Sequence, residues 1–147
     1  MTVAVQLGEG AHTYRNDTDW AKLPEGIGWR EVAGVVVGLD KKVYVFARGD
    51  YPVVVFDADG TYLANWGQGL CSNPHAITLG PSNTFYVTDH FGHAIRQVNY
   101  EGELLLTIGE PGVASELHGG RPFNMPTDVA VDPSTGDLFI SDGYKNS

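Results

Sequence analysis

The chain has 147 residues, enough for one domain with an ordinary core, and its net charge of −9 comes from 9 basic and 18 acidic side chains. It contains no basic run, so nucleic acid and anionic membrane surfaces, which bind clustered cations, are excluded as expected partners. The single cysteine, Cys71, cannot form a disulfide within the chain, and no segment approaches the ~18 apolar residues of a membrane span. No signal peptide is recognisable, which leaves the compartment open.

The chain starts with a short apolar segment, residues 1–10, that reads as a lone strand ending in Gly-Glu-Gly. Similar endings recur at residues 62–69 and 104–112. We therefore expect residues 1–10 to form the outermost, closing strand of a blade whose other strands lie elsewhere. Residues 11–31 show no clear period and predict an irregular crossing segment.

Two sets of four short strands are expected next, over residues 31–69 and 73–112. In both sets, apolar runs of a few residues alternate with turns rich in Gly, Asp and Pro, which is typical of β-hairpins. A third set opens at Asn124 and contains two strands within residues 124–147. A repeat of roughly 40 to 50 residues built from short strands indicates a β-propeller or a similar array.

The expected strands add up to a partial propeller, about two and a half to three blades of a ring. Such a set of strands exposes long sheet edges, and exposed edges invite pairing with other strands. We therefore expect self-association, or a second chain, to complete the propeller.

Strand alternation brings five side chains to one end of the blades. His75 opens the first strand of the second blade, and Arg48, Asp89 and Asp142 end the second strands of the three blades. Tyr144 lies two residues beyond Asp142. Because the loop before strand one and the loop after strand two lie at the same end, all five should face that end, near the axis, where ligands are expected.

Each of these residues also has a structural interpretation. Asp89 and Asp142 occupy equivalent repeat positions, which favours turn capping over chemistry. Arg48 replaces aspartate at that position, and a break in a repeat is typical of functional sites. A lone histidine such as His75 is more often structural, and Tyr144 is equally compatible with covering a loop.

Other sequence signals for chemistry are absent. The chain has no nucleophile elbow, phosphate-binding loop or dinucleotide fingerprint. The remaining histidines show no spacing typical of metal ligands. They are His12, His90, His93 and His118.

A more specific resemblance is carried by several short motifs within residues 31–147. The motifs are Phe-Ala-Arg-Gly-Asp at 46–50, Pro-His-Ala-Ile at 74–77, Tyr-Val-Thr-Asp at 86–89, and above all residues 126–131 with 141–147. The repeats resemble NHL repeats, and the chain is similar to bacterial relatives of peptidyl-α-hydroxyglycine α-amidating lyases. This resemblance implies an all-β, six-bladed NHL-type propeller with zinc and calcium on its axis.

The resemblance also implies a reaction and roles for individual residues. Lyases of this family cleave a peptidyl-α-hydroxyglycine into a peptide amide and glyoxylate. By position, His75 would be one of three zinc histidines, and Val35 and Ile77 would offer backbone carbonyls to calcium. Arg48 would bind or polarise the substrate, and Tyr144 would act as the base on the hydroxyl group.

The family's remaining zinc histidines and its calcium carboxylate belong to later blades, so the implied metal sites need a completed ring. Two other functions stay open. One is a calcium-dependent hydrolase such as a lactonase, for which Asp128 is the local carboxylate candidate. The other is a non-enzymatic NHL scaffold that binds a protein or peptide. Both enzymatic hypotheses, the lyase and the hydrolase, imply a peptide or small-molecule substrate.

Overall fold

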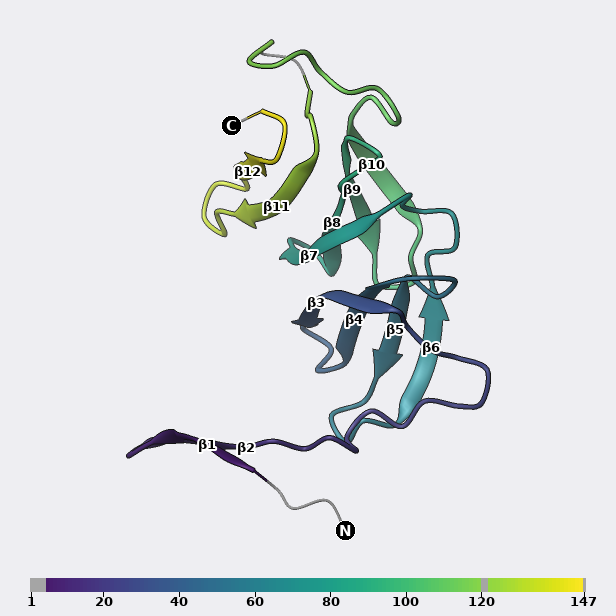
Figure 1. Ribbon diagram of the computed structural model, residues 1–147, viewed down its shortest axis with the longest axis vertical. Coiled ribbons are helices and arrows are strands. Elements are labelled where there is room, and N and C mark those ends of the chain that lie inside the picture. The colour runs from purple at the N-terminus through teal and green to yellow at the C-terminus, as the bar shows by residue number, and fades with distance from the viewer. Residues whose placement is uncertain (1–4, 120–121, 147) are drawn as a thin grey trace.

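The computed structural model describes residues 5–119 and 122–146, and the regular secondary structure in these ranges is entirely β (Figure 1). It consists of two four-stranded and two two-stranded antiparallel sheets. No described helix is long and apolar enough to cross a membrane. The predicted all-β class, with propeller-type blades, is confirmed.

The first blade contains four strands in the sheet order β3-β4-β5-β6. Tight turns join them because short polar residues hold the backbone: the Asp57 carboxylate accepts hydrogen bonds from the Asp59 and Thr61 amides at 3.0 and 2.8 Å. The strands are β3 (Glu31–Val37), β4 (Val43–Arg48), β5 (Val53–Phe56) and β6 (Tyr62–Trp66).

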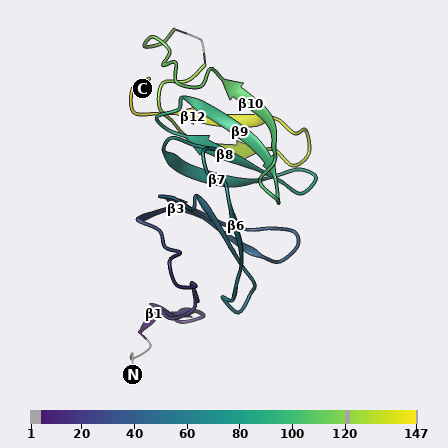
Figure 2. The ribbon, with the colours of Figure 1, turned by 90° about the vertical axis from the view of Figure 1, so that its right-hand side faces the viewer.

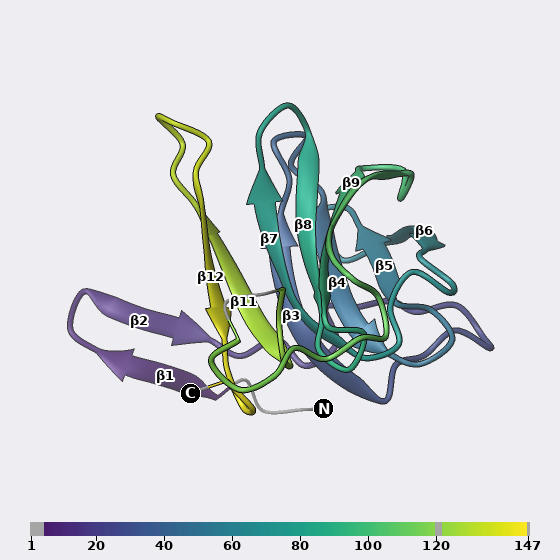
Figure 3. The same ribbon diagram turned by 90° about the horizontal axis from the view of Figure 1, so that it is seen from above.

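The second blade repeats the same antiparallel order, and a third begins with two strands. The first strands of successive blades, β3, β7 and β11, lie next to one another, as the view in Figure 3 shows. The remaining strands are β7 (Pro74–Gly80), β8 (Thr84–Asp89), β9 (Ala94–Asn99), β10 (Leu104–Gly109), β11 (Pro126–Val131) and β12 (Leu138–Asp142).

The core lies between the blades, and the two-residue period of the strands divides it. From β8, Phe85 and Val87 face the first blade, whereas Tyr86 packs toward Val129 of the third. The Phe85 ring lies 4.6 Å from the Tyr44 ring, centroid to centroid. Each blade is therefore held by side chains of its neighbours, and the relative placement of the blades is fixed by packing.

The far face of the first blade is covered by residues 20–29. Trp20 and Trp29 lie 5.4 and 6.0 Å from the Phe56 ring, and the Trp20 indole N–H donates to the Ala58 carbonyl at 3.1 Å. Gly60 is required here, because a Cβ atom at this position would lie 1.8 Å from the Trp20 carbonyl oxygen. The crossing segment is thus a packed cover for the sheet.

The N-terminal region forms a hairpin of β1 (Gln6–Glu9) and β2 (His12–Arg15), which extends away from the blades in Figures 1 and 2. The expectation that residues 11–31 are irregular was therefore wrong for β2. A turn with positive φ at Gly10 lets this polar stretch pair with β1. Residues 1–4 lie outside the described residues, and the role of residues 1–10 as a closing strand stays a prediction.

Candidate functional site

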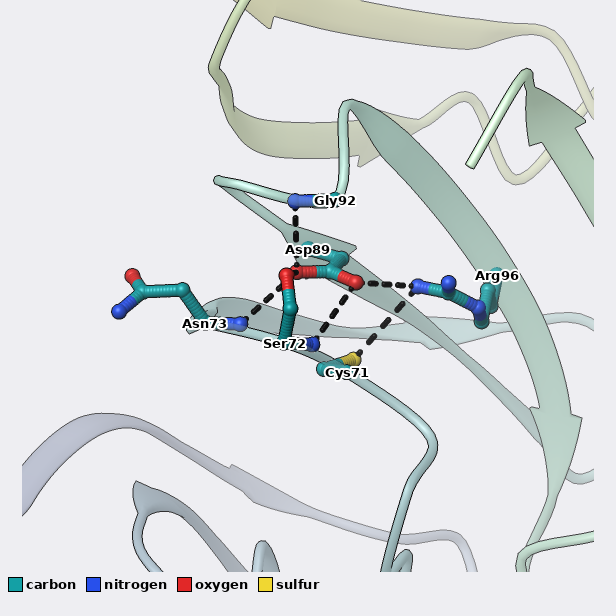
Figure 4. A network of polar contacts seen from close by, with 6 residues as sticks. All are labelled: Cys71, Ser72, Asn73, Asp89, Gly92 and Arg96. Atoms are coloured by element: carbon teal, nitrogen blue, oxygen red, sulfur yellow. Dashed lines mark hydrogen bonds and ion pairs between the residues drawn. The ribbon is translucent and has the colours of Figure 1, made fainter. Parts of the chain in front are cut away.

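The start of β7 is held in place by the carboxylate of Asp89, which is 1% exposed (Figure 4). Its two oxygens accept hydrogen bonds from the Ser72, Asn73 and Gly92 amides at 2.9–3.0 Å and from the Ser72 hydroxyl at 2.8 Å. An ion pair with Arg96, also at 2.8 Å, completes the set. The carboxylate thereby ties the segment before β7 to the turn after β8.

These contacts decide the protonation state of Asp89. Burial raises the pKa of the carboxyl group, but the hydrogen bonds from Ser72 and Asn73 and the contact with Arg96 outweigh burial, and the pKa is lowered overall. Asp89 is therefore ionised and fully engaged. Of the two roles considered from the sequence, the contacts support the structural one.

Asp142 repeats this arrangement in the third blade with fewer partners. Its carboxylate accepts a hydrogen bond from the Asn124 amide at 2.8 Å and another from the Asn146 side chain. The Asn146 backbone amide also donates to the Gly143 carbonyl at 2.8 Å, which closes the turn that carries Tyr144. The aspartate at this repeat position thus sets where Tyr144 lies.

Arg48 occupies the same repeat position in the first blade and makes different contacts. Its Nε–H donates to the Pro74 carbonyl at 3.2 Å, across the boundary to the second blade. Its guanidinium also pairs with Glu31, its neighbour on β3. The side chain is 36% exposed. Arg48 therefore lies between two blades, and the residue that it contacts, Pro74, directly precedes His75 in the sequence.

His75 lies between the second and third blades. Its Nδ1 is 2.8 Å from the Thr127 carbonyl oxygen, and because a carbonyl only accepts, Nδ1 carries the proton. Its ring centre lies 5.9 Å from that of Tyr144, with the rings edge to face. The structure thus brings Arg48, His75 and Tyr144, one from each blade, to one end of the sheets.

His90 is a member of this cluster that the sequence analysis did not single out. It follows β8 directly, is 8% exposed, and its ring centre lies 5.0 Å from those of both His75 and Tyr144. Burial lowers its pKa, the nearby His75, Arg48 and His93 lower it further, and the Pro126 carbonyl acts in the opposite direction. The available signal was its position beside Asp89, at the end where the other candidates converge.

Val35 and Ile77 lie on the adjacent first strands β3 and β7. Val35 is 63% exposed and Ile77 is 7% exposed. The strands approach closely, since a Cβ atom added to Gly34 would lie 3.2 Å from a methyl group of Ile77. The two residues are thus placed on neighbouring inner strands, and their role as calcium ligands stays a prediction.

The described residues do not fit a complete metal centre. They contain no group of three or more His, Cys, Asp or Glu side chains arranged to hold a metal ion, whereas a zinc site needs about three protein ligands. Asp128, the carboxylate considered for a calcium-dependent hydrolase, accepts hydrogen bonds from the Val129 amide and the Thr78 hydroxyl at 2.8 and 3.4 Å. Within the described chain, Asp128 belongs to no group of three or more His, Cys, Asp or Glu side chains that could hold a metal ion.

Comparison with known proteins identifies a repeat family for part of the chain and solved structures with a similar fold. Residues 123–147 match the NHL repeat family model. A streptogramin B lyase structure aligns with a TM-score of 0.52 and 22% identity, over 76% of this chain and 34% of that chain. A virginiamycin B lyase structure from Staphylococcus aureus gives the same TM-score and coverage at 13% identity. The fold is thus of the β-propeller type, and residues 123–147 match one NHL repeat.

Three relatives then show which named proteins the chain is similar to in sequence. Peptidyl-glycine alpha-amidating monooxygenase B of Xenopus laevis is 31% identical over 96% of this chain and 18% of its own length. NHL repeat-containing protein 3 of Homo sapiens is 30% identical over 97% of this chain and 43% of its own length. Peptidyl-alpha-hydroxyglycine alpha-amidating lyase 1 of Drosophila melanogaster is 33% identical over 61% of this chain and 16% of its own length. The chain thus spans less than half of each relative.

Proposed function

We propose that this chain is part of a metal-dependent NHL propeller lyase that cleaves a peptidyl-α-hydroxyglycine into a peptide amide and glyoxylate once the ring is complete. The observation that carries the proposal is the convergence of Arg48, His75 and Tyr144 from three successive blades at one end. The similarity to proteins named as amidating monooxygenase and amidating lyase supports it. Zinc at His75 and calcium at the Val35 and Ile77 carbonyls belong to this proposal.

In the reaction, the chain's own residues bind the substrate and move one proton. Arg48 binds the carboxylate or the hydroxyl oxygen of the hydroxyglycine, since a guanidinium matches such oxygens well. Tyr144 removes the hydroxyl proton, the C–O bond becomes the carbonyl of glyoxylate, and the C–N bond breaks. The amide nitrogen gains a proton and leaves as the peptide amide, so no oxidant or reductant is needed.

The site requires residues beyond the described part of the chain. His75 offers one imidazole, and the described residues supply no complete metal centre. We therefore propose that self-association or a second chain completes the propeller. Native mass spectrometry tests this: a dimer or a complex supports it, whereas a monomer at micromolar concentration argues against self-association.

Glyoxylate release from a peptidyl-α-hydroxyglycine by the assembled, zinc-supplied protein tests the reaction. We expect Tyr144→Phe to lower the rate by a factor on the order of 10²–10⁴, the usual contribution of a general base. Tyr14→Phe is a matched control, because Tyr14 is also 66% exposed but lies on the distant hairpin. Release that is equal in Tyr144→Phe and the wild type, after subtraction of the enzyme-free rate, would contradict the role of Tyr144.

A second candidate function is a non-enzymatic NHL scaffold that binds a protein or peptide. Similarity to NHL repeat-containing protein 3 over nearly the whole chain favours it, together with the 65% exposed ring of Phe139 on β12. This function predicts no glyoxylate release in any assembly. Peptide binding that Phe139→Ala weakens and Tyr144→Phe leaves unchanged would support the scaffold over the lyase.

A further inference from the structure

The outermost strands of the two four-stranded blades, β6 and β10, begin in the same way (Figure 1). Both follow a turn in which one side chain, Asp57 in the first blade and Asn99 in the second, accepts hydrogen bonds from the amides two and four residues later. Both then contain a bulge that leaves one leucine, Leu63 in β6 and Leu105 in β10, without a partner residue on the neighbouring strand. The outer rims of the two blades can therefore be compared residue by residue.

The rim of the first blade is covered by the chain itself. Lys22 forms a parallel bridge with Thr61, and its amide donates to the Gly60 carbonyl at 2.9 Å. The Lys22 ammonium group donates to the Asp59 carbonyl, also at 2.9 Å, and the Trp20 ring packs on the same sheet. A short extended segment with an aromatic and a basic residue thus occupies the start of this edge.

The rim of the second blade is open in the part of the chain that the structure describes. The equivalent carbonyls, those of Glu101 and Gly102, accept no backbone hydrogen bond there. The Trp66 ring approaches Gly102 as Trp20 approaches Gly60, since a Cβ atom added to Gly102 would lie 2.6 Å from it. One side of β10 pairs with β9, and no described strand pairs with the other side. The second blade therefore offers a free strand edge.

This free edge begins with three exposed leucines. Residues 104–106 are 54%, 53% and 47% exposed, whereas the equivalent residues of β6 are Tyr62, Leu63 and Ala64. Leu63 and Ala64 are exposed although the second blade beside them has all four strands, so exposure here does not come from an incomplete neighbour. Natural edge strands usually carry charges against unwanted pairing, and an apolar edge is instead typical of an interaction site.

The charge around the edge indicates which partner fits. Glu101 and Glu103 precede β10, Glu110 follows it, and β10 itself carries no charged residue. The net charge of −9 opposes a second copy of this chain, whereas an apolar segment flanked by lysine or arginine is attracted. Lys22 already supplies such a cation at the first blade.

We propose that the outer edge of β10 binds an extended peptide segment of a partner protein, in which apolar residues are flanked by lysine or arginine. The segment pairs with the backbone of β10 as a fifth strand of the blade. Its apolar side chains contact the leucines at 104–106, and its cations meet the flanking glutamates. This surface lies on the outermost strand, whereas the proposed lyase site lies at the ends of inner strands, so it does not rest on the lyase proposal.

The surface is tested with the fluorescein-labelled peptide Lys-Lys-Leu-Thr-Leu-Thr-Leu-Lys-Lys, followed by fluorescence anisotropy. We expect one peptide per chain. N-methylation of the three peptide leucines removes main-chain donors and should weaken binding at least about tenfold, because strand addition depends on main-chain hydrogen bonds. Replacing the four peptide lysines with glutamates should weaken binding by a similar factor, since they would face the glutamates of the chain.

Variants of the chain locate the peptide. Leu105→Ser and Leu106→Ser should each weaken binding at least about fivefold. Leu63→Ser, at the equivalent bulge of β6, is the matched control and should bind as the wild type does. All three leucines are about half exposed, so the variants should unfold at similar temperatures. Bound peptide should also slow hydrogen exchange of the backbone amides of residues 103–109, which reports strand pairing directly.

Three results would overturn the proposal: no binding up to millimolar peptide, equally tight binding of the N-methylated or glutamate peptide, or equal weakening in Leu63→Ser and Leu105→Ser. Binding that is lost in Phe139→Ala and kept in Leu105→Ser would likewise overturn it, by placing the peptide on the third blade. Peptide binding at β10 without glyoxylate release in the completed assembly would confirm this surface and overturn the lyase. Glyoxylate release without peptide binding would do the reverse.

Discussion

The ends of β8 and β4 occupy the same position in two successive blades but use it in opposite ways. At the end of β8, Asp89 is 1% exposed and binds groups of its own blade. At the end of β4, Arg48 is 36% exposed and donates to the Pro74 carbonyl of the next blade. A carboxylate at this position stabilises one blade, whereas a guanidinium reaches the boundary between two.

This difference shows how a repeat can keep its fold and still build a site. Asp89 is short and accepts several backbone N–H groups, so it fixes the loop before β7 and with it His75. Arg48 is long and only donates, so it needs carbonyl or carboxylate oxygens and finds them at Pro74 and Glu31. Stability should therefore depend on Asp89, and ligand binding on Arg48.

The largest effect on stability is expected for Asp89→Ala. The change leaves Arg96, which is 12% exposed, without its partner and removes the acceptor of three backbone amides, so we expect a loss of about 3–5 kcal/mol in the free energy of unfolding. Asp142→Ala, at the equivalent half-buried position with two partners, should cost about 1–2 kcal/mol. Urea unfolding of both variants measures these losses in the free energy of unfolding. Equal losses would contradict the larger structural role of Asp89.

The contribution of Asp89 should also depend on pH. Its pKa in the folded chain lies below the unfolded value of about 3.9, so its stabilisation is fully present above that value and is lost as the pH falls through the folded pKa. The difference in unfolding free energy between the wild type and Asp89→Asn should thus be constant near neutral pH and shrink below about pH 4. A difference that grows on acidification would contradict the lowered pKa.

Gly92→Ala should have an intermediate effect, because a Cβ atom at residue 92 would lie 1.9 Å from an Asp89 carboxylate oxygen. Displacing that oxygen weakens its hydrogen bonds, and we expect a loss of about 1–3 kcal/mol. Gly28→Ala is the control, since no heavy atom lies within 4 Å of the added carbon. Thermal unfolding compares the two, and equal losses would show that the carboxylate can move at little cost.

The smallest effect on stability is expected for Arg48→Lys. The Arg48–Glu31 pair is substantially exposed, and such pairs contribute about 0–1 kcal/mol, so the free energy of unfolding should change by less than about 1 kcal/mol. If the lyase proposal holds, glyoxylate release should nevertheless fall at least about tenfold, because lysine cannot replace the planar guanidinium. An Arg48→Lys variant that is strongly destabilised but fully active would show that Arg48 supports stability rather than ligand binding.

The sequence by itself determined the strands of the blades, the propeller-type fold and much of the candidate site. Alternating apolar residues and turn-forming Gly and Asp are local signals, and a strand period of two decides which end of a blade each residue reaches. These signals were sufficient to predict that Arg48, His75 and Tyr144 converge.

The tertiary structure alone decided the features that depend on contacts between distant segments. Strand β2 forms in a stretch without a period because β1 offers it a partner, and Trp20 and Trp29 become a cover because Phe56 lies beneath them. The position of His90 beside Asp89 indicates only the end of the blade at which it lies, and its ring contacts with His75 and Tyr144 are visible only in the tertiary structure. Only the packing of the second blade against the third brings these rings together, and no local pattern encodes that packing.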